Sequence, residues 1–166
     1  MAGRFRVQGP FDIASTQMKG GQRIEKANVL EFCKSHRTLC KGKGCYVFIV
    51  RVRNGALPFY VGKATKSFEQ EVFTSDKMDK YNSALAEYSF RVTPRLLFLV
   101  YQKNGRGRDN LNAISSLEKT LTFLGKVRNP RIKNVQNTNN EEDFEIVGLK
   151  SRGARSEELK SLLRLF

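Results

Sequence analysis

KGKGCYVFIVRVRNGALPFYVGKA, residues Lys41 to Ala64, is the stretch that decides the fold. Its two apolar-rich runs are Cys45–Val52 and Phe59–Gly62. Between them lies Asn54-Gly55, the dipeptide most typical of a tight turn between antiparallel strands. The stretch therefore predicts a β-hairpin.

The two tyrosines of this hairpin are expected on one face of its sheet. Side chains alternate between the two faces along a strand, which puts Tyr46 together with Phe48 and puts Tyr60 together with Gly62. Two phenols on one face are candidates for packing or for chemistry.

The hairpin carries a paired motif. Gly44-Cys45-Tyr46, followed after thirteen intervening residues by Tyr60-Val61-Gly62 and then Lys63, resembles the signature of the GIY-YIG nuclease family. The resemblance extends from the hairpin to Asn134. It implies an α+β fold, with a small three-stranded antiparallel sheet flanked by helices and with terminal extensions.

The pattern outside the hairpin divides the chain into three parts. Residues 1–40 are expected to form a basic arm, covering 1–22, followed by a helix from 24 to 35. Residues 41–135 form the nuclease-like core, and residues 136–166 add a polar loop, an edge strand and a packed terminal helix. Within the core we expect the following elements: helices from Ser67 to Thr74, Lys77 to Glu87 and Ala113 to Leu124, and a central strand from Arg95 to Tyr101.

The resemblance assigns roles to the residues of a catalytic site. It implies that Tyr46 is the general base or its relay, that Tyr60 orients water or phosphate, and that Glu118 holds one Mg²⁺ or Mn²⁺ ion. A phenol is a poor base at its ordinary pKa near 10, and Lys63 is placed to supply the positive charge that would assist it. The alternative for Glu118 is a salt bridge to a neighbouring Lys or Arg.

The sequence departs from the family pattern at one position. The family usually has an arginine about a dozen residues after the second tripeptide, whereas residues 64–76 contain none. Lys66 and Lys77 are the nearby cations, and Lys77 is the candidate replacement, although an ammonium lacks the planar fork that binds two phosphate oxygens. Gly62, Lys66 and Asn134 are candidate substrate-binding residues, and Asn134 is equally well explained as a residue that caps a turn.

The charge of the chain favours a polyanionic partner. Thirty Lys and Arg against sixteen Asp and Glu give a net charge of +14 over 166 residues, and the excess lies in residues 1–140. Lys and Arg bind phosphates with release of counterions, so nucleic acid is the expected partner. Double-stranded DNA is preferred, although charge does not distinguish DNA from RNA. A cutter of palindromic sites would be expected to form a symmetric dimer.

The three cysteines raise the question of a zinc site. Cys33, His36, Cys40 and Cys45 have a spacing close to that of a zinc knuckle. Reduced thiols are the preferred interpretation, because the chain shows no secretory signal and because buried free Cys commonly packs as a small apolar residue. No apolar run is long enough to span a membrane, so a cytoplasmic or nucleoid-associated protein is expected.

These features predict a metal-dependent endonuclease that hydrolyses phosphodiester bonds in DNA, of the restriction or mobile-element kind. The first alternative is a weakened or inactive module of the same fold that binds nucleic acid. The second is a basic ribosome- or partner-binding protein in which the hairpin motif arises by chance.

Overall fold

The computed structural model describes residues 3–53, 55–103, 109–134, 144–147, 149 and 155–166. The strands are β1 (Gly3–Asp12), β2 (Thr16–Met18), β3 (Gly21–Arg23), β4 (Gly44–Val52), β5 (Gly55–Ala64), β6 (Thr93–Gln102) and β7 (Phe144–Ile146). The helices are α1 (Lys26–Ser35), α2 (Arg37–Cys40), α3 (Phe68–Glu71), α4 (Ser75–Leu85), α5 (Leu111–Arg128) and α6 (Glu157–Leu165).

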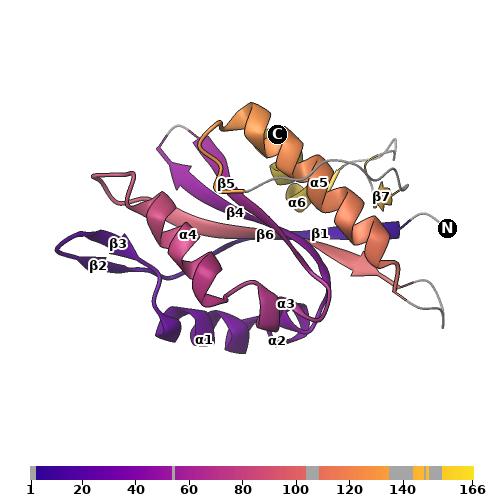
Figure 1. The fold of residues 1–166 in the computed structure, drawn as a ribbon, viewed down its shortest axis with the longest axis horizontal. Helices are drawn as coiled ribbons and strands as arrows, with labels where there is room; N and C mark the ends of the chain where they lie inside the picture. The colour runs from indigo at the N-terminus through magenta and orange to yellow at the C-terminus, as the bar shows by residue number, and fades with distance from the viewer. Residues whose placement is uncertain (1–2, 54, 104–108, 135–143, 148, 150–154) are drawn as a thin grey trace.

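A curled five-stranded sheet runs through the molecule in the order β5-β4-β6-β1-β7 (Figure 1). The pairs β4–β5, β4–β6 and β1–β6 are antiparallel, whereas β7 runs parallel to β1. The expected fold class, a small three-stranded antiparallel sheet, is therefore wrong. The protein has a mixed α/β fold in which the predicted strands β5, β4 and β6 form only part of a larger mixed sheet.

The expected basic arm is the main source of this error. Residues 3–12 form the ten-residue strand β1, which fills the sheet between β6 and β7. Phe5 and Val7 are buried, while Arg4 and Arg6 between them are exposed. This alternation is typical of a strand with one covered face, and the register shift between Gln8 and Phe11 accommodates the Gly-Pro step.

Each face of the sheet carries its own apolar core. Helices α1 to α4 cover one face, and α5 and α6 cover the other (Figure 1). Tyr46 and Phe48 of β4 point into the first core, whereas Cys45 and Val47 point into the second. The predicted hairpin is confirmed in the described residues, since β4 pairs with β5 from Gly44↔Ala64 onwards. The predicted turn residue Asn54 lies outside those residues.

Helix α5 lies along the edge strand β5 on the second face. At its start the Asn110 side chain accepts a hydrogen bond from the Ala113 amide at 3.0 Å, so Asn110 caps the helix. At its end the Asn129 side chain donates to the Pro58 carbonyl at 2.8 Å. This contact fixes the helix against β5 and places Glu118 near that edge of the sheet.

Candidate functional site

The hairpin brings Tyr46 and Tyr60 onto the same face, as predicted. Tyr46 pairs across the strands with Gly62, and Phe48 pairs with Tyr60. The centroids of the two phenol rings are 6.1 Å apart. Because Gly62 has no side chain, the Tyr46 ring lies directly against the edge strand.

Tyr46 itself is fully buried. Its hydroxyl donates to the Glu71 backbone carbonyl at 3.4 Å, and burial raises the pKa of Tyr46 well above its ordinary value. Tyr81, also buried, donates to the Val72 carbonyl at 2.8 Å and stacks on Phe48. A phenol in this setting stays protonated, so its geometry suits positioning better than the base role that the resemblance implies.

Tyr60 is the more accessible of the two phenols. It is partly exposed, and the ammonium of Lys80 lies 5.4 Å from the centroid of its ring. Burial, followed by the negative charge of Glu118, raises the pKa of Tyr60. Tyr60 is therefore the phenol of the pair that solvent reaches, and its hydroxyl is suited to donate a hydrogen bond.

Lys77 approaches Tyr46 from helix α4. Its ammonium lies 5.8 Å from the centroid of the Tyr46 ring and donates to the Glu71 carbonyl. Partial burial lowers the pKa of Lys77, while the nearby carboxylates of Glu71, Asp76 and Glu118 oppose that shift. The candidate replacement for the missing arginine is thus beside the tyrosine pair.

The Lys66 side chain is exposed, and its backbone amide donates to the Glu71 carboxylate at 2.6 Å. The amide of Thr65 donates to the same carboxylate oxygen at 2.7 Å. The Glu71 side chain therefore stabilises the turn after β5. Its backbone carbonyl accepts hydrogen bonds from the Tyr46 hydroxyl and the Lys77 ammonium. The role of Glu71 is not predictable from the sequence, because no local pattern indicates that its backbone carbonyl meets a distant phenol.

Lys63 and Glu118 form an ion pair on the other side of the edge strand. Lys63 Nζ is 3.1 Å from Glu118 Oε2 and donates to Ser115 Oγ at 3.1 Å. Both side chains are partly exposed, 37% for Lys63 and 23% for Glu118. The alternative predicted for Glu118, a salt bridge to a neighbouring Lys or Arg, is therefore present, and the carboxylate still reaches solvent.

Two groups of polar side chains lie on opposite faces of the edge strand β5. Tyr60 and Lys77 belong to the face covered by α4, whereas Lys63 and Glu118 belong to the face covered by α5. Glu118 nevertheless acts electrostatically on both Tyr60 and Lys77. We take these four side chains as the candidate site.

Asn134 binds the edge of β5 next to this site. Its side chain accepts from the Val61 amide at 2.8 Å and donates to the Val61 carbonyl at 2.6 Å. Lys133 adds a bond from its amide to the Phe59 carbonyl at 2.7 Å. Asn134 thus anchors a loop to the strand and completes the hydrogen bonding of Val61.

The cysteines do not gather around His36. Cys45 points into the core under α5, where its thiol contacts the Ile114 carbonyl at 3.2 Å. Cys33 and Cys40 lie together on the opposite face, and burial raises the pKa of Cys40 to about 12. In the part of the chain that the structure describes, no three His, Cys, Asp or Glu side chains are placed to hold one metal ion.

Comparison with known proteins adds no relative: no protein-family model, no curated protein and no solved structure matches this chain. Among the described residues, none of the helices has the length and apolar character needed to cross a membrane.

Proposed function

We propose that the protein is a metal-dependent endonuclease that hydrolyses phosphodiester bonds in DNA. The observation that carries the proposal is the placement of Tyr60 and Lys77 on one face of the edge strand β5 and of the Lys63–Glu118 ion pair on its other face. Phosphodiester hydrolysis needs positive charge near the phosphate and a positioned water, and these side chains are of the right kind for both. The net charge of +14 supports a polyanionic substrate. A DNA substrate would put the protein in the cytoplasm, at the nucleoid.

The residues present fit a loosely held divalent ion. Mg²⁺ in such sites commonly takes one or two carboxylates and fills its remaining positions with water and substrate phosphate. Glu118, 23% exposed, would provide the carboxylate. The bound ion would neutralise charge on the phosphate. Because Lys63 engages Oε2 of the same carboxylate, metal binding would compete with the ion pair.

The protein's own side chains have separate tasks in this proposal. Lys77 and Lys63 place positive charge on either side of the scissile phosphate. Tyr60 donates a hydrogen bond to a phosphate oxygen or to the attacking water. Tyr46, buried beneath them, packs against β5 and donates to the Glu71 carbonyl. Because the Lys77 ammonium donates to the same carbonyl, Tyr46 helps to position Lys77.

A second candidate, a module of this fold that binds nucleic acid without cutting it, is favoured by two observations. Tyr46 is buried, which raises the pKa of its phenol well above the ordinary value, and Glu118 is already paired with Lys63. In that case the same cations would contact phosphates without activating water.

Incubation of supercoiled plasmid with the protein and Mg²⁺ tests the proposal. We expect nicking that requires the ion and falls about 100-fold or more in Glu118→Gln and Lys77→Met, as for other losses of transition-state electrostatics. Glu69→Gln on α3 and Lys34→Met on α1 remove like charges from exposed positions and should cut normally. The absence of cleavage by any of these proteins, together with salt-sensitive DNA binding by all of them, would support the binding module instead.

A further inference from the structure

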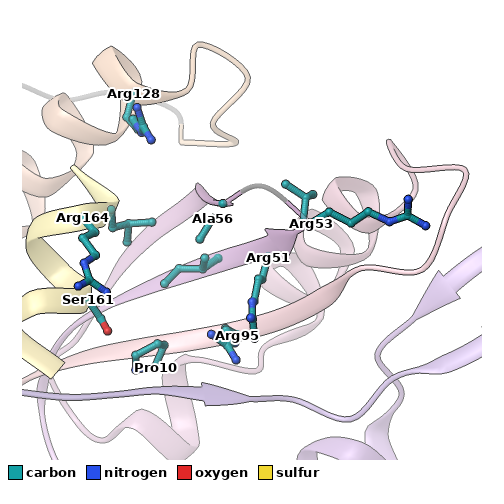
Figure 2. A pocket seen from close by; sticks show the side chains of 12 residues that line it. Pro10, Arg51, Arg53, Ala56, Arg95, Arg128, Ser161 and Arg164 are labelled. Carbon is teal, nitrogen blue, oxygen red and sulfur yellow. The ribbon is translucent and has the colours of Figure 1, made fainter. Parts of the chain in front are cut away.

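A second concentration of positive charge lies at the other end of the hairpin. Five arginines surround a hollow of about 410 Å³ there, and they come from the sheet, the hairpin tip and both helices of the second face (Figure 2). They are Arg51, Arg53, Arg95, Arg128 and Arg164. We call this hollow the arginine pocket.

The floor of the arginine pocket is apolar and fixed by the fold. Ile49, buried on β4, and Leu165, buried on α6, both line it. In Figure 2, Arg51 extends toward Arg95 on the sheet side, and Arg164 lies on α6 across the hollow. Arg51, Arg95 and Arg164 therefore lie around this packed floor, whereas the side chain of Arg53 extends away from it.

Little negative charge balances these arginines. Over the described ranges, Asp12 is the one carboxylate in an ion pair with any of them, and its partner is Arg95. Glu157, on the same helix as Arg164, is paired with Lys160 at 2.6 Å. Arg51 and Arg95 are diagonal neighbours on adjacent strands, where long side chains reach one another.

Helix dipoles explain only part of this arrangement. Arg128 and Arg164 lie in the last turns of α5 and α6, where a cation is favourable for the helix. That reason does not apply to Arg51 at the end of β4 or to Arg53 beyond it. A bound anion would relieve the repulsion among all of them.

We propose that the arginine pocket binds phosphate groups. Guanidinium groups bind phosphate oxygens in pairs, and several around one hollow would accept a ligand with more than one phosphate. The volume suits a group of nucleotide size. The phosphates belong either to a free nucleotide or polyphosphate, or to the backbone of a nucleic acid.

Binding of phosphates from a nucleic-acid backbone rests on the proposed function and extends it. Arg128 follows Glu118 by ten residues on α5, a distance of about 15 Å along the helix axis. At about 3.4 Å per nucleotide along one strand, that separation corresponds to roughly four nucleotides of a duplex. The arginine pocket would hold the DNA at a second point and set the register of the strand at the candidate site.

Binding measurements with EDTA present test this proposal separately from cleavage. The probes are a fluorescent DNA duplex, ATP and inorganic pyrophosphate. The test protein is Arg51→Gln/Arg164→Gln, and the matched control is Arg37→Gln/Arg91→Gln, which removes two exposed arginines elsewhere. Thermal melting of all three proteins checks that the folds remain intact.

We expect the test protein to bind the duplex at least tenfold more weakly than the control does. The slope of the logarithm of its DNA association constant against the logarithm of salt concentration should also be smaller in magnitude by about 2, because two phosphate contacts are lost. Competition by ATP or pyrophosphate, lost in the test protein, would assign the site to a free phosphate ligand. Weakened duplex binding without such competition would assign it to the nucleic-acid backbone. Equal duplex binding by test and control proteins, with no binding of ATP or pyrophosphate by the wild type, would overturn the proposal.

Discussion

The ring of Tyr46 lies against the α-carbon of Gly62, so closely that a Cβ built on Gly62 would be 2.3 Å from the Tyr46 hydroxyl oxygen. Tyr46 is fully buried and cannot move outward without disturbing Tyr81 and Phe68 around it. The glycine of the second tripeptide is therefore required by packing, whatever the chemistry of the site.

Gly62→Ala should lower the free energy of unfolding by about 1–3 kcal/mol, the usual cost of an extra carbon in a packed core. Urea denaturation measures the change. Gly20→Ala is the control, because a Cβ there meets no atom within 4 Å, and it should leave stability nearly unchanged. Equal stability of the two variants would show that the Tyr46–Gly62 contact is not tight in solution.

Exchange of each tyrosine for phenylalanine separates positioning from direct contact with substrate. Tyr60 is partly exposed, whereas Tyr46 is buried and its hydroxyl donates to the Glu71 backbone carbonyl at 3.4 Å. Tyr60→Phe should slow plasmid cleavage about 10-fold or more while leaving DNA binding intact, as expected for loss of a hydrogen bond made in the transition state.

Tyr46→Phe, measured in the same single-turnover assay, should retain the greater part of the activity. A larger loss in Tyr46→Phe than in Tyr60→Phe would reverse this assignment and restore Tyr46 as the base.

The hairpin and the helix that carries Glu118 follow from local patterns in the sequence. Alternation along Cys45–Val52 and the turn signal predict which residues share a face, and the structure has Tyr46 and Tyr60 on one face. Strand β1 is not predicted, although Arg4, Phe5, Arg6 and Val7 alternate, because the Gly-Pro step, the Gly20-Gly21 pair and the few regularly spaced apolar residues of this segment favour an arm. The size of the sheet depended on this strand, whose partner β6 is distant in sequence.

The role of Glu71 was also beyond local reasoning. Its carbonyl receives Lys77 and Tyr46 only because the end of α3 is folded back onto the hairpin. Likewise, the arginine pocket joins β4, β6, α5 and α6, and no single window of sequence contains more than two of its arginines.

The buried tyrosines should make the protein sensitive to alkaline pH. Burial raises the pKa of Tyr46 and of Tyr81 well above the value of 10.0 that a free phenol has. Between the unfolded and folded pKa values the native state binds more protons than the unfolded state, so stability is full below about pH 10 and falls as the pH rises further. Each such phenol contributes a slope of up to about 1.4 kcal/mol per pH unit.

Tyr46→Phe should therefore flatten the decline of unfolding free energy above pH 10, measured by urea denaturation at a series of pH values. Lys77, whose lowered pKa acts in the opposite direction, is present in both proteins. An alkaline slope identical in wild type and Tyr46→Phe would show that Tyr46 ionises normally in the folded state.

Asn134 should protect the backbone amide and carbonyl of Val61, at the edge of β5, from solvent. Its side chain makes both of the hydrogen bonds that a neighbouring strand would make there, at 2.8 and 2.6 Å. Asn134→Ala leaves the Val61 amide and carbonyl dependent on water, which should lower stability by about 1–3 kcal/mol.

Amide hydrogen exchange gives the sharper measurement, because the loss of protection should be confined to Val61 and its neighbours on β5. The amide of Val47, bonded within the centre of the sheet, serves as the internal reference. Unchanged exchange at Val61 would mean that the loop ending at Asn134 does not pair with the strand, and the candidate site would then lie beside an open sheet edge.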